Sequence, residues 1–181
     1  ALGNAIEIVT IAEHAGPVSS SAGPKTIADY AFNNAPELDL ILLPGGIGTI
    51  PELNNEAMLD FLKSRGPKSQ ITMSVCTGSA LLAKAGLLDG LAATSNKMFF
   101  DLARSQNDQV QWQESARWVD AGRYVTSSGV SAGTDMALAV IQRLFGAEAA
   151  QNVVNYSEYQ WHQEADIDPF ESLLNQGQLP G

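Results

Sequence analysis

The stretch 71–82 changes its hydrophobic period abruptly at Cys76, the single cysteine of the chain. Residues 71–75 suit a buried strand, and the apolar residues of 80–88 recur at helical spacing. The pattern predicts a strand, a tight turn and a helix in succession, with the cysteine at the corner. A strand-to-helix corner is a place where a fold can display a nucleophile.

Small residues flank this cysteine on both sides. Ser74 and Gly78, two positions before and after Cys76, allow the close approach that a tight turn needs. The following helix would direct free backbone N–H groups at the corner, which favours a thiolate over a thiol. We interpret Cys76 as a reactive cysteine; the alternative is a small hydrophobic residue buried in the core.

A second strand is predicted to end in a glycine-rich turn. The apolar run 38–43 is typical of a parallel strand covered on both faces, and Pro44, Gly45 and Gly46 follow it directly. Such a turn lets backbone N–H groups approach a ligand at the edge where an open α/β sheet binds its ligands. No Gly-Lys-Ser or Gly-Lys-Thr follows, so the turn is not a phosphate loop.

The segment 126–135 is rich in small and hydroxylated residues and leads into an amphipathic helix at 136–145. Its small side chains permit close backbone approach beside Cys76. The candidate pocket residues in this segment are Ser128, Gly129 and Val130. Asp135 is interpreted as a stabiliser of the helix N-terminus rather than as a catalytic acid.

The rest of the chain alternates strands and helices. We expect strands at 6–12, 91–95, 110–112 and 117–119, a return strand at 124–125, a small hairpin or loop over 18–24, and helices from Pro51, over 98–104 and over 147–161. This order predicts an α/β fold, a three-layer α/β/α sandwich with a flavodoxin-like, mostly parallel sheet and a nucleophile elbow. The ends of strands 38–43, 71–75 and 125–127 would meet at one crevice. We expect one domain over 1–170 and a C-terminal tail over 171–181. The acidic stretch from His162 to Gly181 as a whole is interpreted as a tail that wraps over the surface.

Composition argues against several classes of function. Ten basic residues against twenty acidic ones give a net charge of −10, which repels phosphate backbones and anionic membranes. One cysteine cannot form an internal disulfide, and no apolar run reaches the length of a membrane span. We therefore expect a cytoplasmic protein that binds neither nucleic acid nor membrane, and we predict neither a metal nor a cofactor.

The motifs together resemble those of the ThiJ/PfpI superfamily, which has the class I glutamine amidotransferase-like fold. The matching pieces follow the family's order over residues 6–170: Leu42 to Gly46, Ser74 to Ser79, Ala85 to Gly90, Ala93-Thr94 and Ser128 to Leu138. The Cys-Thr-Gly form is most similar to the isocyanide hydratase branch, whereas protease-like and glyoxalase-like members more often have Cys-His-Gly.

The resemblance implies covalent catalysis by Cys76. As a thiolate it would attack the carbon of a small substrate, an isocyanide in the best-matched branch, and water would resolve the thioimidate to an N-substituted formamide. An oxyanion hole would come from backbone N–H groups of the Gly45-Gly46 turn and of Thr77, whose hydroxyl would orient water. Tails of relatives pack near a dimer interface, so a homodimer is expected, with His162 the histidine closer to the site.

Two departures from the family pattern bear on the site. The hydratase branch has His-Trp where this chain has Asn96-Lys97, which makes Asn96 a further pocket candidate. The family's first strand, with the acid that hydrogen-bonds the cysteine, has no counterpart here. Because that strand lies beside both 6–12 and 38–43, its removal would leave backbone groups unpaired. We therefore expect further residues, including the catalytic acid, before Ala1.

Other functions are compatible with the same cysteine. A glyoxalase-like or amidase-like hydrolase would use the same nucleophile, and a non-enzymatic redox or stress sensor would use its oxidation to sulfenic or sulfinic acid. The ligand-sensing half of a larger regulator is disfavoured because no helix-turn-helix pattern or basic segment follows the tail.

Overall fold

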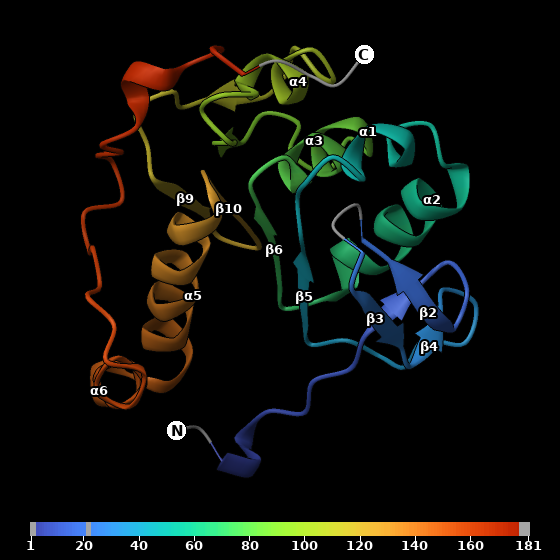
Figure 1. The fold of residues 1–181 in the computed structure, drawn as a ribbon, viewed down its shortest axis with the longest axis horizontal. Coiled ribbons are helices and arrows are strands. Elements are labelled where there is room, and N and C mark those ends of the chain that lie inside the picture. Colours follow the sequence, from blue (N-terminus) through green and yellow to red (C-terminus); the bar gives the residue numbers. More distant parts are fainter. Residues whose placement is uncertain (1–2, 21–22, 178–181) are drawn as a thin grey trace.

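The computed structural model describes residues 3–20 and 23–177, and a four-stranded sheet lies at its centre (Figure 1). The strand order is β5-β6-β10-β9. The strands β5 (Leu40–Leu43), β6 (Ile71–Val75) and β10 (Tyr124–Ser127) are parallel, and β9 (Trp118–Ala121) is antiparallel to β10. The predicted strand at 71–75 is therefore confirmed, as is the α/β fold with a mostly parallel sheet.

Helices cover both faces of this sheet, as Figure 1 shows. The helix α5 (Val130–Phe145) packs on β6, β9 and β10, while α3 (Gly78–Lys84) packs on the other face of β6, with α2 (Glu56–Arg65) against it. Each face has its own apolar core, which includes Leu43, Leu62, Leu82 and Leu88 on the α3 side and Met73, Val125, Met136 and Val140 on the α5 side. The sheet and the helices on its two faces form three layers, with one core between each pair of neighbouring layers.

The described part of the chain has three further α-helices and six further strands. The helices are α1 (Thr49–Glu52), α4 (Phe100–Arg104) and α6 (Ala147–Ser157). The strands, which form three two-stranded sheets, are β1 (Ile11–Ala12), β2 (Gly16–Ser19), β3 (Lys25–Ala28), β4 (Tyr30–Ala31), β7 (Ala92–Ala93) and β8 (Gln111–Trp112). None of the helices described here is long and apolar enough to cross a membrane.

Three predicted helices have different limits in the structure. The helix expected from Pro51 is two helices, because Asn55 is extended and its side chain accepts a hydrogen bond from Met58 N (3.3 Å), which starts α2. The helix expected at 136–145 begins at Val130, after the extended Gly129. The last helix ends at Ser157, where the left-handed Glu158 stops it (φ 49°).

The strand expected at 6–12 is short and lies outside the central sheet. Only Ile11–Ala12 is a strand, and it pairs with β4. Among residues 3–20 and 23–177, the strand β5 pairs with β6 alone, and its Leu42 is 57% exposed. The hairpin expected near 18–24 is formed by β2 and β3, with residues 21 and 22 outside the described part. A strand before Ala1 that would join these elements stays a prediction.

Candidate functional site

The corner at Cys76 joins β6 to α3. Cys76 has a φ of 59°, in the left-handed region that residues other than glycine seldom adopt. Such a backbone costs on the order of 1–3 kcal/mol and persists only where the surroundings hold it. The predicted nucleophile elbow is therefore present in the fold, and the packing around it explains how the conformation is held.

Glycines let three neighbouring segments close on this corner. A Cβ atom on Gly45 would lie 2.6 Å from Thr77 N and 2.8 Å from Cys76 Cβ, and one on Gly78 would lie 2.7 Å from Leu43 O. On the α5 side, a Cβ on Gly133 would lie 2.8 Å from the Val75 side chain. Real Cβ atoms do not approach this closely, so the predicted convergence of the strand ends depends on these glycines.

Hydrogen bonds fix the backbone of Cys76 on both sides. Its N–H donates to the carbonyl oxygens of Ser128 (2.8 Å) and Ser127 (3.2 Å), at the end of β10. Its carbonyl oxygen accepts from the hydroxyls of Ser79 (3.2 Å) and Ser95 (3.2 Å). The junction after β10 and the loop after β7 therefore both hold the cysteine.

The hydroxyl of Thr77 is buried and joins the glycine turn to the elbow. Gly46 N–H donates to it (2.9 Å), and the Thr49 hydroxyl lies 3.0 Å away. The N–H of Gly46, which we predicted for an oxyanion hole, is thus already bound to Thr77. The backbone N–H of Thr77 acts on the Cys76 thiol itself, which makes it the candidate donor for negative charge that develops at the sulfur or on a group bonded to it.

Burial raises the pKa of the Cys76 thiol, and the groups that oppose this effect are the Thr77 N–H, the Thr77 hydroxyl and the Asn96 side chain. Desolvation outweighs these hydrogen bonds because the charged thiolate loses more hydration than they replace. The N–H of Thr77, at the start of α3, favours the thiolate as expected, but burial opposes it with the larger effect. Asn96, predicted as a pocket residue, does lie against the thiol.

Four charged side chains are buried behind the site, and the sequence analysis missed their association. Lys97 Nζ lies 3.7 Å from Asp168 Oδ2, and Arg117 NH1 lies 3.6 Å from Asp168 Oδ1. Arg117 also donates to Asp135 Oδ2 from Nε (2.7 Å) and NH2 (2.6 Å). Asp135 is thus one half of a buried ion pair, and its expected role at the helix N-terminus is wrong. The tail, expected on the surface, sends Asp168 into the interior.

The predicted pocket residues after β10 point in different directions. The Ser128 hydroxyl is buried and donates to Asp168, away from solvent. Gly129 lies beside Asn96, whose Nδ2 would be 3.8 Å from a Cβ at that position. Val130 is the first residue of α5 and is 82% exposed. Of the three, Gly129 is the one that the structure brings beside a side chain in contact with the thiol.

His162 lies away from the cysteine. Its backbone N–H donates to Asp135 Oδ1 (3.0 Å), and it lines a cavity of about 450 Å³ together with Arg117, Ser131, Tyr159, Gln160, Pro169 and Phe170. Cys76 does not line this cavity. His14, the other histidine, is 87% exposed beside Glu13.

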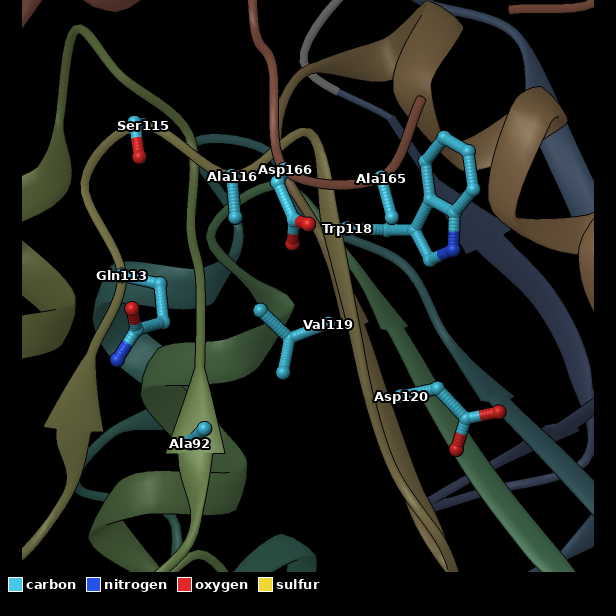
Figure 2. Close-up of a pocket in the computed structure, with 9 residues that line it drawn as sticks. All are labelled: Ala92, Gln113, Ser115, Ala116, Trp118, Val119, Asp120, Ala165 and Asp166. Carbon is cyan, nitrogen blue, oxygen red and sulfur yellow. The ribbon is translucent and has the colours of Figure 1, made fainter. Parts of the chain in front are cut away.

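A larger cavity of about 590 Å³ lies against the outer strand β9 (Figure 2). Figure 2 shows Trp118, Val119 and Asp120 along one wall and the tail residues Ala165 and Asp166 across from Gln113. Its lining residues include neither a cysteine nor a histidine. The candidate chemistry therefore stays at the elbow rather than in this cavity.

Similar proteins support the assignment of the fold. An isonitrile hydratase from Pseudomonas putida is 37% identical over 156 residues, which are 86% of this chain and 65% of that protein. The transcriptional regulator GbdR from Pseudomonas aeruginosa is 29% identical over 164 residues, 89% of this chain and 44% of the regulator. This chain thus spans less than two thirds of the length of these relatives.

A solved structure gives the same result. The crystal structure of a ThiJ/PfpI family protein from Pseudomonas syringae matches with a TM-score of 0.76 and 31% identity, over 86% of this chain and 64% of that one. The sequence profile of the DJ-1/PfpI family matches residues 2–143, which contain the whole elbow and the glycine turn. The chain belongs to the DJ-1/PfpI family.

Proposed function

We propose that the chain is a cysteine-dependent hydratase or hydrolase of a small molecule, and that its substrate is an isocyanide. The observation that carries the proposal is Cys76, held in a left-handed conformation at the corner between β6 and α3. The similarity to an isonitrile hydratase supports the choice of substrate. With an isocyanide as substrate, the isocyanide carbon is the electrophile that the Cys76 sulfur attacks.

The proposed reaction adds water to the isocyanide in two stages. The Cys76 sulfur bonds to the isocyanide carbon, and that carbon takes up a proton, which gives a thioimidate. Water then adds to the carbon–nitrogen double bond. The carbon–sulfur bond breaks, the sulfur regains a proton, and an N-substituted formamide leaves. The sum is one isocyanide and one water for one formamide, without an oxidant or a reductant.

The residues around the thiol suit the stages in which charge develops. The backbone N–H of Thr77 would stabilise negative charge on the substrate, as an oxyanion-hole donor does. The Asn96 side chain would stabilise charge on the sulfur, because it lowers the pKa of the thiol. Neither group accepts a proton at neutral pH. The catalytic acid that the family resemblance predicts before Ala1 is the group we propose for proton transfer.

Turnover against a panel of isocyanides, dicarbonyls and small amides tests this function. We expect formamide from isocyanides, and no product from Cys76→Ala, with the circular dichroism and melting temperature of the variant close to those of the parent. Turnover of isocyanides that survives in Cys76→Ala would rule out the covalent mechanism. Turnover of dicarbonyls or amides alone would favour the glyoxalase-like or amidase-like alternative.

A redox sensor is the alternative from a different class. Oxidation and nucleophilic attack both use the thiolate, so the raised pKa of the buried Cys76 thiol bears on both functions alike. Mass spectrometry separates the two functions: an adduct derived from substrate on Cys76 supports catalysis, whereas stoichiometric oxidation without turnover supports sensing.

We also propose a homodimer and a cytoplasmic location. Large apolar side chains are exposed on α5, α6 and the tail, namely Val130, Tyr156, Ile167 and Phe170. Exposed apolar surface of this kind favours a protein partner, and we take a second copy of the chain as that partner. Cell fractionation tests the location, and the oligomeric state is taken up in the Discussion.

A further inference from the structure

A buried ion pair connects the loop 94–97, which binds Cys76 through Ser95, to Asp168 in the tail, which binds Ser128 beside Cys76. Lys97 lies in the loop 94–97 and Asp168 in the tail, and their side chains are 2% and 0% exposed. Charges buried this deeply are stable only where good partners surround them. Lys97 and Asp168 also form hydrogen bonds of their own, and these bonds determine which segments the ion pair holds in place.

Lys97 anchors the loop that reaches the cysteine. Its Nζ donates to Ala116 O (2.6 Å) and to the Thr94 hydroxyl (3.0 Å). Between these anchors the loop presents Ser95, whose hydroxyl donates to Cys76 O (3.2 Å), and Asn96, whose side chain lowers the pKa of the thiol and whose Oδ1 accepts from Phe99 N–H (3.2 Å). The Lys97 ammonium therefore closes the loop 94–97 over the elbow.

Asp168 anchors the opposite side of the cysteine. Its Oδ2 accepts from the Ser128 hydroxyl, and that hydroxyl in turn accepts from Gly129 N–H (2.6 Å). Ser128 O is the acceptor of the Cys76 N–H at 2.8 Å. The carboxylate therefore fixes the junction 127–129, which carries the backbone acceptor of Cys76.

The carboxylate itself is held by the surrounding elements. Its Oδ1 accepts from Phe170 N–H (3.1 Å), and Asp168 N–H donates to Ser115 O (2.7 Å), next to the wall of the cavity in Figure 2. Arg117 connects it to Asp135 on α5, so that two cations and two anions are buried together. The tail is thus part of the frame behind the site.

We propose that the Lys97–Asp168 ion pair is a positioning element for Cys76. It ties the loop 94–97 to the junction 127–129 and so keeps Asn96 against the thiol. The inference rests on the proposed role of Cys76 as nucleophile. Neither Lys97 nor Asp168 is a catalytic residue, since they act through Asn96 and Ser128.

Positioning and long-range charge make opposite predictions for two substitutions. If the pair acted through its charges alone, Lys97→Met would raise the pKa of Cys76 and Asp168→Asn would lower it. If the ion pair acts by holding Asn96 beside the thiol, both substitutions release the Asn96 side chain and both raise the pKa of Cys76. The common direction is therefore the signature of a positioning role.

The single cysteine makes the experiment direct. Alkylation of Cys76 by iodoacetamide is followed between pH 6 and about pH 11, and the rate follows the thiolate fraction. We expect Lys97→Met and Asp168→Asn each to slow alkylation at pH 7 by about tenfold, which corresponds to about one unit in the thiol pKa. Arg143→Met, which removes an exposed ion pair with Asp120, is the matched control and should leave the profile unchanged.

A double variant tests whether the pair acts through Asn96. In the Asn96→Ala background, Lys97→Met should slow alkylation no further, because the donor it positions is already gone. Fully additive effects of Asn96→Ala and Lys97→Met on the alkylation rate would overturn the proposal. So would shifts of the Cys76 pKa in opposite directions for Lys97→Met and Asp168→Asn, or a lower melting temperature with an unchanged alkylation profile. If Lys97→Met does not fold, Ser128→Ala, which removes one hydroxyl of the chain of contacts, should still slow alkylation, and an unchanged rate would equally overturn it.

The readout also separates this inference from the proposed function. Alkylation needs no substrate, so the profile reports the position of Asn96 whether or not isocyanides are turned over. If isocyanides are substrates, kcat should fall in the same variants while KM changes little, because the pair does not touch the substrate.

Discussion

At the scale of single residues, the protonation state of Cys76 is set by burial against a few hydrogen bonds. Burial raises the pKa of the thiol, while Thr77 and Asn96 lower it. A group with a raised pKa in the folded state stabilises the protein below its ordinary pKa, and this stabilisation is lost as pH rises through the folded value. For Cys76, the pH range over which this stabilisation is lost lies on the alkaline side of neutrality.

The first prediction concerns Asn96. Asn96→Ala removes one of the groups that lower the pKa of Cys76, so alkylation by iodoacetamide should require a higher pH than in the parent chain. Stopped-flow or mass-spectrometric rates across pH give the midpoint. Asn155→Ala, an exposed position on α6, is the control and should follow the parent. A lower midpoint in Asn96→Ala would contradict the assigned contact.

The second prediction concerns the glycine turn. A methyl group on Gly45 would meet Thr77 N at 2.6 Å and Val75 O at 2.7 Å, whereas one on Gly48 would meet nothing within 4 Å. Gly45→Ala should therefore lower the free energy of unfolding by about 1–3 kcal/mol and reduce turnover, because backbone must move at the elbow. Gly48→Ala should change both little. Equal melting temperatures for the two variants would contradict the close packing.

At the scale of elements, the strand β6 contains one buried hydroxyl without a hydrogen-bond partner among the described residues, close to Cys76. The Ser74 hydroxyl is buried and has no hydrogen-bond partner within the described ranges, whereas the buried Ser69 hydroxyl bonds Gly66 O (3.0 Å) and Thr72 Oγ1 (2.8 Å). An unpaired buried hydroxyl costs about 1–3 kcal/mol.

The third prediction follows from that contrast. Ser74→Ala removes the unpaired group and should raise the midpoint of urea unfolding, while Ser69→Ala removes a paired hydroxyl and should lower it. Both substitutions delete one oxygen at a buried position, so cavity effects are matched. A loss of stability in Ser74→Ala as large as in Ser69→Ala would show that the Ser74 hydroxyl has a partner in solution.

The elements that the sequence predicts well are those with a local pattern. The run at 71–75 has the composition of a buried strand, and the structure has β6 at the same residues. The start of α5 was missed because Ser131, Gly133 and Thr134 are weak helix formers, and packing against Val75 decides their conformation. The association of Lys97 with Asp168 has no sequence signature, since 71 positions separate residues that only the fold brings together. The raised thiol pKa was missed for the same reason, because burial is a property of the whole site.

At the scale of the whole molecule, one end of the structure exposes apolar surface. Tyr159, Pro169 and Phe170 line the cavity of about 450 Å³, with Phe170 50% exposed, and the exposed Val130 directly precedes Ser131 in its wall. With a net charge of −10, copies of the chain repel one another at long range, so association needs apolar burial to offset that repulsion.

The last prediction places the proposed dimer interface at this surface. Sedimentation velocity should give a dimer for the parent chain and a monomer for Phe170→Glu, because a carboxylate at the centre of an apolar contact loses its hydration on association. Ile27→Glu is the matched control, because Ile27 lies on β3, is 59% exposed, and the substitution adds the same charge. The Ile27→Glu variant should stay dimeric. A dimer in Phe170→Glu together with a monomer in Ile27→Glu would move the interface to the β2–β3 hairpin. A monomeric parent chain at 0.15 M salt, where repulsion beyond about 8 Å is largely screened, would rule out the homodimer itself.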